Sequence, residues 1–236
     1  MRASTVKAIA AKAARQYSVA EVAALAKSLY AHGAWLRRKT QQLRPYSCPV
    51  EVLLSIFPES GTVLDVGCGS GLFLGLALAS GKTIVATGVD ISEPALRLAM
   101  EMRQAGLDAA QRARLTFHHV RSTADWPSRT FDMVSLIDVM HHVPPAQRAE
   151  LLAAVADHVR PGGILLYKDM VQRPRWRAFF NWLHDLAIAR DWIRYQPIAQ
   201  IDAAAKRARF VEVRAETINC LWYGHEMRVY RKKLAP

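Results

Sequence analysis

Residues 62–71 read Thr-Val-Leu-Asp-Val-Gly-Cys-Gly-Ser-Gly and are the most informative stretch of the chain. The first half is an apolar, β-branched run typical of a buried strand. The second half places Gly67, Gly69 and Gly71 at alternate positions, and a helix is expected over 71–80. Glycines at this spacing allow a sharp turn and let a ligand lie against the backbone, because no Cβ projects there. The stretch therefore predicts a strand, a glycine turn and a helix that form a ligand site.

An acidic residue, Asp65, precedes the first glycine by two positions, at the carboxyl end of the predicted strand. A carboxylate there repels a pyrophosphate but suits a cationic amino group, and the spacing differs from the dinucleotide fingerprint Gly-x-Gly-x-x-Gly. The pattern Asp-x-Gly-x-Gly-x-Gly resembles the first motif of the class I S-adenosylmethionine-dependent methyltransferases. That resemblance implies S-adenosylmethionine as cofactor, and it assigns the following residues to its site: Asp65, Gly67, Cys68, Gly69 and Gly71.

A second acidic residue, Asp90, ends the next apolar run, 83–89. A carboxylate at the tip of the strand after a glycine turn is placed to accept hydrogen bonds from ribose hydroxyls. In the resembled family the acidic residue has that role and the next apolar residue, here Ile91, packs on adenine. The alternative is that Asp90 only caps the helix that starts near Glu93.

The third predicted strand leads into Arg121-Ser-Thr-Ala-Asp-Trp-Pro127. The resembled family has an acidic residue here that binds the adenine amine, and this chain has Ser122 in its place. We therefore assign Ser122 and Thr123 to the adenine end of the site, with Asp125 as the alternative acceptor. A serine hydroxyl can also accept a hydrogen bond.

The fourth strand and its exit loop run from Phe131 to Pro144, and the resemblance places Asp138 near the methionine part of the cofactor. His141 and His142 would then lie beside the methyl acceptor, where histidine suits the role of general base. His142 is the first candidate for this role, with His141 and Lys168 behind it; the alternative is that the histidines only support the loop. Lys168 and Asp169 are expected to emerge at the ligand edge and to neutralise one another; the alternative is that they orient an anionic substrate. The pattern implies no metal ion.

Length and composition describe one globular domain of ordinary size, with 236 residues, of which 51% are hydrophobic. No apolar stretch approaches the ~18–20 residues of a membrane span. Three separated cysteines show neither a metal-binding spacing nor a disulfide framework. These features favour a cytoplasmic protein.

The net charge of +12 is concentrated in the two flanks of the chain. Residues 1–45 hold nine Lys and Arg against one acidic residue, and residues 168–236 hold fourteen against seven. Residues 46–167, which contain the glycine turn, hold nine against twelve. Basic flanks suggest an anionic partner, namely an acidic carrier protein, an anionic membrane surface at the inner face, or nucleic acid. The alternative is that these side chains only solubilise helices.

The order of elements predicts an α/β fold with a Rossmann-like, mostly parallel seven-stranded sheet, helices on both faces and an antiparallel C-terminal hairpin. Strands are expected at 62–67, 83–89, 114–120, 131–138, 163–169, 210–217 and 226–232. Helices are expected at 5–15, after Ser18, and at 50–57, 71–80, 93–105, 145–159, 174–193 and 199–208. We expect a basic helical cap and connector over 1–49, and a methyltransferase domain over 50–236.

The segment 170–200 is expected to be a lid that binds the acceptor. Aromatic residues in its middle alternate with arginines, a mixture that fits an apolar pocket with a basic rim. The resemblance thus implies methyl transfer to oxygen or carbon of a small apolar or acyl-type acceptor, as in natural-product or lipid biosynthesis. The alternatives are an RNA methyltransferase, suggested by the charge, and a non-catalytic cofactor-binding subunit of a complex.

Overall fold

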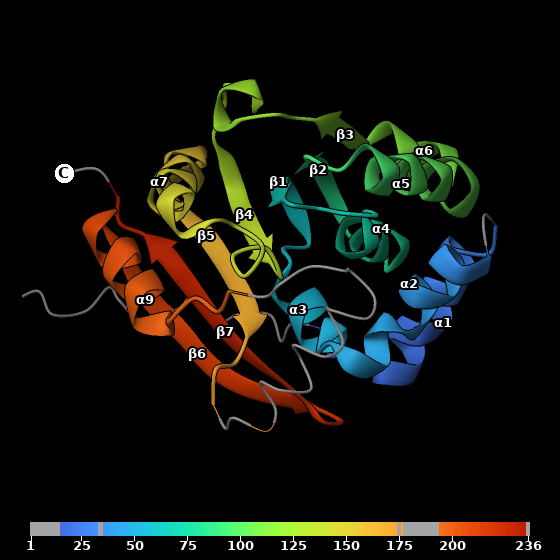
Figure 1. Ribbon diagram of the computed structural model, residues 1–236. Helices are drawn as coiled ribbons and strands as arrows, with labels where there is room; N and C mark the ends of the chain where they lie inside the picture. The colour runs from blue at the N-terminus through green and yellow to red at the C-terminus, as the bar shows by residue number, and fades with distance from the viewer. Residues whose placement is uncertain (1–14, 33–34, 174–175, 177–193, 235–236) are drawn as a thin grey trace, which may run out of the picture.

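The computed structural model describes residues 15–32, 35–173, 176 and 194–234. Its centre is a seven-stranded sheet in the order β3-β2-β1-β4-β5-β7-β6 (Figure 1). The first five strands are parallel, and β7 pairs antiparallel with both β5 and β6. The strands are β1 Ser60–Val66, β2 Thr83–Asp90, β3 Leu115–His119, β4 Phe131–Ile137, β5 Val159–Met170, β6 Phe210–Cys220 and β7 Tyr223–Lys232. The predicted α/β fold with a C-terminal hairpin is confirmed.

Helices cover both faces of this sheet (Figure 1). One face carries α1 Val19–Leu29, α3 Val50–Ile56, α4 Leu72–Ala79 and α5 Glu93–Gly106, and the other carries α7 Arg148–His158 and α9 Ile198–Arg207. The remaining described elements are α2 Trp35–Ser47, α6 Ala109–Ala113 and the short 3₁₀ turns η1 Thr123–Asp125 and η2 Pro145–Gln147. None of the helices within the described ranges is long and apolar enough to cross a membrane.

The helix after Ser18 forms as its sequence predicts. The Ser18 hydroxyl accepts the Glu21 backbone N–H at 3.2 Å, and the Glu21 carboxylate accepts the Ser18 N–H at 2.7 Å. This capping box satisfies two backbone donors at the helix start. The buried residues Val22, Ala26 and Leu29 then face the core, so the apolar stripe of α1 packs against the helices α4 and α5.

The structure differs from the expected elements at helix α2 and at the start of β5, and two of the expected helices fall outside the described residues. Within the segment 1–49, expected to be a basic helical cap and connector, residues 35–47 form helix α2, which the sequence did not predict and in which Pro45 stands two residues before the end. A proline near a helix end removes one hydrogen bond without breaking the helix body. The fifth strand begins at Val159 rather than 163, with an irregular register opposite β4. The helices expected over 5–15 and 174–193 lie outside the described residues, except Arg15 and Trp176.

Candidate functional site

The glycine turn after β1 has all three glycines in the left-handed region, with φ of +68°, +54° and +78° for Gly67, Gly69 and Gly71. A Cβ on Gly67 would lie 2.5 Å from Cγ2 of Val139, and one on Gly71 would lie 2.5 Å from Cζ of Phe117. A Cβ on Gly69 would meet nothing within 4 Å. The outer glycines are thus required for packing, whereas the middle one faces open space in which a ligand can lie.

Asp90, at the carboxyl end of β2, holds this turn in place by hydrogen bonds to backbone N–H groups. Its Oδ2 accepts the Gly69 N–H at 2.6 Å, and its Oδ1 accepts the Ser92 N–H at 2.7 Å. Both oxygens keep lone pairs for further donors such as hydroxyls. The side-chain cap of α5 is Ser92, which accepts the Ala95 N–H, so Asp90 is not the capping residue that the alternative required. Ile91 beside it is 75% exposed and free to pack on a planar ring.

Asp65 is a buried carboxylate at the end of β1. Its Oδ1 accepts the Ser135 hydroxyl at 2.6 Å, whereas Oδ2 is buried without a hydrogen-bond partner among the described residues. Burial raises the pKa of Asp65 to about 7, and the nearby charge of Asp90 acts in the same direction. A cation brought against the unpaired oxygen would stabilise the ionised form. The open turn and this oxygen together fit a ligand with an ammonium group, as S-adenosylmethionine has.

Tyr30 supports the same turn from the N-terminal cap, and the sequence did not reveal this role. Its buried hydroxyl donates to the Ser70 backbone carbonyl at 2.8 Å, across 40 residues of sequence. Burial raises the pKa of the Tyr30 hydroxyl, so it stays a donor at neutral pH. No local pattern marks such a contact, because it depends on how α1 packs on α4.

The turn after β3 holds the residues assigned to adenine. The Asp125 carboxylate accepts the Arg121 N–H at 2.8 Å and the Ser122 N–H at 2.9 Å, and these backbone bonds lower the pKa of Asp125. Ser122 and Asp125 are exposed, and Thr123 is half-buried at the start of η1. Asp125 therefore organises this turn, and the adenine contacts of Ser122 and Thr123 stay predictions.

Asp138 ends β4 in the left-handed region, with φ of +56°. Lys168 donates to its two carboxylate oxygens at 2.6 and 2.8 Å, and Arg44 donates to Oδ2 at 2.7 Å. Burial opposes the charge, but the Lys168 ammonium and the Arg44 guanidinium hold the pKa of Asp138 well below its ordinary value. This cluster joins α2, β4 and β5, and Arg44 is a member that the sequence did not reveal.

The expected pair of Lys168 with Asp169 is wrong, and Lys168 does not emerge at an edge. Lys168 is fully buried and pairs with Asp138, while Asp169 pairs with His141. Consecutive residues of a strand point to opposite faces of the sheet, so neighbouring opposite charges on a strand find different partners.

His141 is buried, and its Nδ1 hydrogen-bonds to Oδ1 of Asp169. His142 is exposed, with its ring centroid 4.0 Å from that of His141. A carboxylate on Nδ1 fixes the ring orientation and stabilises an imidazolium, as a general base requires. The structure thus favours His141 over His142 as the base, because His141 is buried against the Asp169 carboxylate whereas His142 is exposed.

Donor atoms of Asp138, His141 and Asp169 lie within 4.8 Å of one another, a spacing that could hold a metal ion. The charge of Asp138 is already neutralised by Lys168 and Arg44. We therefore assign no metal to this cluster.

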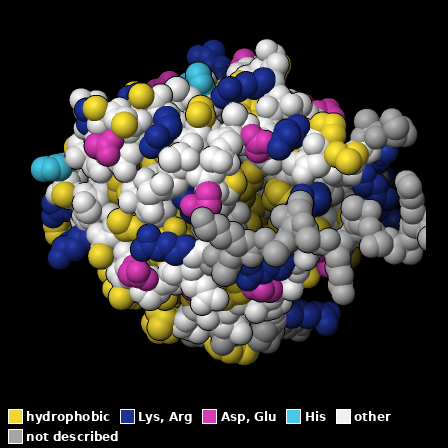
Figure 2. Space-filling view, turned by 180° about the vertical axis from the view of Figure 1, so that it is seen from behind, with side chains coloured by type: hydrophobic (Ala, Val, Ile, Leu, Met, Phe, Trp, Pro, Cys, Tyr) yellow, Lys and Arg dark blue, Asp and Glu magenta, His cyan; other side chains and the backbone are white. Residues whose placement is uncertain are grey.

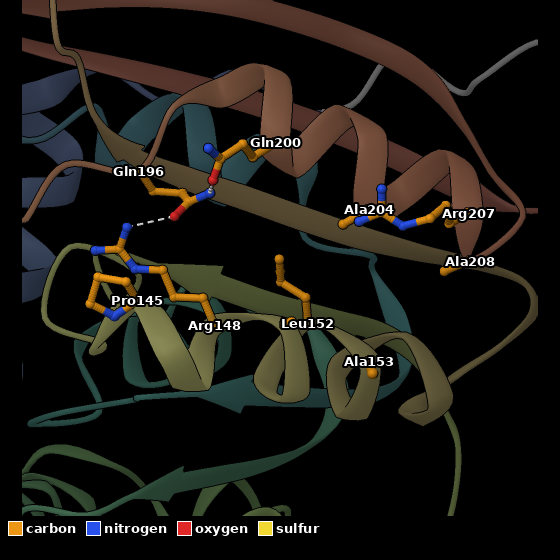
Figure 3. A pocket seen from close by; sticks show the side chains of 10 residues that line it. Pro145, Arg148, Leu152, Ala153, Gln196, Gln200, Ala204, Arg207 and Ala208 are labelled. Atoms are coloured by element: carbon orange, nitrogen blue, oxygen red, sulfur yellow. Dashed lines mark hydrogen bonds between the residues drawn. The ribbon is translucent and has the colours of Figure 1, made fainter.

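A groove of about 390 Å³ runs between α7 and α9 (Figure 3). Arg148 lies at one end, where its guanidinium donates to Oε1 of Gln196 at 2.6 Å and to the Val143 carbonyl at 2.9 Å. Gln196 in turn donates to Gln200 at 2.8 Å. None of the predicted site residues lines this groove, so we do not place the cofactor there.

The family model described as "Methyltransferase domain" matches residues 36–214. With this match and the fold, the chain belongs to the class I S-adenosylmethionine-dependent methyltransferase family. The cofactor of that class is S-adenosylmethionine, as the glycine motif predicted.

Known relatives agree with this membership. A ubiquinone biosynthesis O-methyltransferase of Aromatoleum aromaticum is 33% identical over 111 residues, which cover 46% of this chain and 43% of that relative. The matched region therefore spans less than half the length of this curated relative. Magnesium protoporphyrin IX methyltransferase from Synechocystis PCC 6803 with bound SAH has a TM-score of 0.65 at 18% identity, covering 89% of this chain and 94% of that one.

The [4+2]-cyclase SpnF also shares the fold, with a TM-score of 0.62 at 17% identity, covering 91% of this chain and 93% of that one. Structural likeness at these identities concerns the fold alone. Since a cyclase is among the similar structures, the fold does not by itself define the reaction.

Proposed function

We propose that this chain transfers the methyl group of S-adenosylmethionine to a hydroxyl oxygen of a small, apolar acceptor. The observation that carries the proposal is the open glycine turn, which Asp90 holds by accepting the Gly69 N–H. Beside it lies the buried Oδ2 of Asp65, which has no hydrogen-bond partner in the described part of the chain. The cofactor supplies an electrophilic methyl group on a sulfonium. Transfer to oxygen is favoured over transfer to carbon because the curated relatives are named O-methyltransferases.

The cofactor would be held by residues from three strand ends. Gly69 leaves the open space in which it lies, with Gly67, Cys68 and Gly71 shaping the turn. Asp65 would receive the ammonium of the methionine part, Asp90 would accept the ribose hydroxyls and Ile91 would pack on adenine. Asp138 would border the methionine part, with its charge already balanced by Lys168.

His141 is the proposed general base. As the acceptor oxygen forms its bond to the methyl carbon and the carbon–sulfur bond breaks, the hydroxyl proton would pass to the His141 imidazole. Asp169 would hold the ring in place and stabilise the imidazolium. His142 is exposed, so we place it at the rim; Lys168 would act only by holding Asp138.

Delivery of the acceptor by an acidic carrier protein, or from an anionic membrane at the cytoplasmic face, stays a prediction of the charge pattern. On the face shown in Figure 2, the described Lys and Arg side chains are scattered among apolar and acidic ones. That distribution favours neither a continuous track for RNA nor one large basic patch on this face.

The first experiment is a calorimetric titration with S-adenosylmethionine and S-adenosylhomocysteine. Asp90→Ala should weaken both affinities roughly tenfold or more, because hydrogen bonds of a carboxylate are lost. Asp157→Ala, which removes an exposed aspartate on α7, is the matched control and should bind as the wild type does. Equal affinities of wild type and Asp90→Ala would contradict the proposed ribose role.

The second experiment measures transfer of a radiolabelled methyl group to a panel of apolar phenols. His141→Ala should lower kcat by about 10²–10⁴-fold without changing cofactor affinity, whereas His142→Ala should change kcat little. Cofactor binding without turnover on any acceptor until a partner protein is added would favour the non-catalytic subunit instead.

A further inference from the structure

Helix α2 has its polar side chains turned toward the protein. Arg44 donates to Asp138 at 2.7 Å, Gln42 donates to the Tyr30 carbonyl at 2.8 Å, and Arg38 donates to the Ala31 carbonyl at 2.8 Å. A surface helix of a globular protein normally turns its apolar stripe to the core instead. The side of α2 that meets the rest of the chain is therefore largely polar.

The apolar side chains of α2 point outward. Trp35 is 64% exposed, Leu36 70%, Leu43 58% and Tyr46 50%. At about 100° of rotation per residue, these four fall within an arc of about 100° on the helix surface, with Lys39 inside the arc. We call these four residues the α2 outer face. Four large apolar side chains gathered on one exposed stripe mark an interaction surface.

The charge of this helix restricts the partner. Residues 35–47 contain Arg37, Arg38, Lys39 and Arg44 and no acidic residue. Two copies of such a helix placed face to face would repel one another. An exposed apolar stripe that holds Trp and Tyr, on a helix whose charges are all positive, is instead the pattern of a helix lying on an anionic bilayer surface.

The position of α2 agrees with a role at the site. Arg44 joins the helix to Asp138 at the end of β4, so α2 borders the proposed acceptor region. Near its carboxyl end, His225 of β7 donates to the Ser47 carbonyl at 2.8 Å. The turn of the β6–β7 hairpin, at the bottom of Figure 1, presents Leu221 and Trp222 with 63% and 49% exposure. More exposed apolar surface thus lies close to the same end of α2.

We infer that the α2 outer face docks on an anionic lipid bilayer and brings the border of the site to the membrane surface. The apolar side chains enter the interface between head groups and acyl chains, and Lys39 contacts lipid phosphates. An apolar acceptor could then pass to the site from the bilayer, and only this last step rests on the proposed function.

The test is co-sedimentation of the full chain with vesicles of phosphatidylcholine mixed with phosphatidylglycerol, and with vesicles of phosphatidylcholine alone. The wild type should bind the anionic vesicles, and binding should weaken as salt is raised. The triple variant Trp35→Gln, Leu43→Gln and Tyr46→Gln should bind roughly tenfold or more weakly, because three apolar side chains are lost. Lys39→Glu should weaken binding to the anionic vesicles only.

The matched control replaces three exposed apolar side chains elsewhere, with Met100→Gln, Val211→Thr and Val213→Thr, and should bind vesicles as the wild type does. Titration with S-adenosylhomocysteine checks that each variant is folded. No binding of the wild type, or equal binding of the triple variant, overturns the inference. If the wild type is a dimer, the triple variant is a monomer and neither binds vesicles, the α2 outer face binds a second copy of the chain. That result also overturns the inference. Vesicle binding without methyl transfer leaves the docking standing and contradicts only the proposed function.

Discussion

Asp65 and Asp138 stand at the carboxyl ends of two neighbouring strands, β1 and β4, yet they have opposite surroundings. Asp65 accepts a hydrogen bond from the Ser135 hydroxyl and forms no ion pair with the residues that the structure describes, and burial raises its pKa to about 7. Asp138 receives Lys168 and Arg44, and these cations hold its pKa well below the ordinary value despite burial. The same side chain at the same sheet edge thus has two different tasks.

The difference separates the two halves of the site. An ionised, buried carboxylate with one oxygen unbonded among the described residues is costly unless a ligand supplies a positive charge, which marks the β1–β2 half as the place for a cationic group. A carboxylate that already has two cations is part of the framework. The β4–β5 half is therefore built by ion pairs that fix its shape, and its reactive candidate is the separate pair of His141 and Asp169.

The largest expected effect comes from removing the fully buried cation. Lys168→Met should lower the free energy of unfolding by about 3–5 kcal/mol, because Asp138 keeps only the partly exposed Arg44. Urea unfolding at pH 7 measures this loss. Asp65→Asn is the matched comparison and should not lower the free energy of unfolding at pH 7 in the absence of cofactor, because no ion pair is broken and ionising the buried carboxyl group is already unfavourable in the folded wild type. Similar losses in both variants would show that the two carboxylates do not differ.

The second effect is the contribution of Asp65 to the pH dependence of stability. Its pKa is about 7 in the folded chain and near the ordinary 3.8 when unfolded, so the folded state binds the proton more tightly. Its contribution to the free energy of unfolding is complete below about pH 4 and is lost as the pH rises through about 7, a change of at most ~4 kcal/mol. Urea unfolding of the wild type and of Asp65→Asn across this range measures the contribution as the difference between the two curves, because the buried His225, with its pKa lowered to about 3, adds the same pH dependence to both. Parallel curves would contradict the raised pKa.

The third effect links the same carboxylate to the cofactor. An ammonium beside Asp65 favours its ionised form, so S-adenosylmethionine binding should release up to about one proton near pH 6–7. Affinity should then rise with pH, by at most ~1.4 kcal/mol per unit, until Asp65 is ionised. Calorimetry in buffers of different ionisation enthalpy measures the released proton. Asp65→Asn should release none, and release unchanged in that variant would assign the proton to another group.

The smallest effect concerns the second cation on Asp138. Arg44→Met should lower the free energy of unfolding by only about 1 kcal/mol, because the guanidinium is one-third exposed and Lys168 remains. Urea unfolding beside Lys168→Met gives the ratio of the two contributions. If Arg44→Met costs as much as Lys168→Met, the cap is held mainly by this bond and not by packing of α1 on the core.

Local patterns sufficed for the sheet and for the cofactor half. Strands β1 and β2 were marked by apolar, β-branched runs, and the glycine turn was marked by three glycines that all adopt the left-handed backbone conformation. The capping box at Ser18 likewise predicted α1. Helix α2 was missed because its polar residues face the protein and its apolar residues face outward. Its sequence therefore lacks the core-facing apolar stripe by which helices are usually predicted.

The sequence by itself determined the class of fold, the glycine turn and the place of Asp90 at the tip of the next strand, because each depends on residues close together in the chain or at fixed places after a strand. Only the tertiary structure decided that Lys168 pairs with Asp138 and that Asp169 pairs with His141. It likewise decided that Arg44 and Tyr30, from the N-terminal helices, hydrogen-bond to Asp138 and to the glycine turn. These contacts join residues 28 to 94 positions apart. Which partner a buried charge finds depends on the face and the packing of its element, and no local pattern records either.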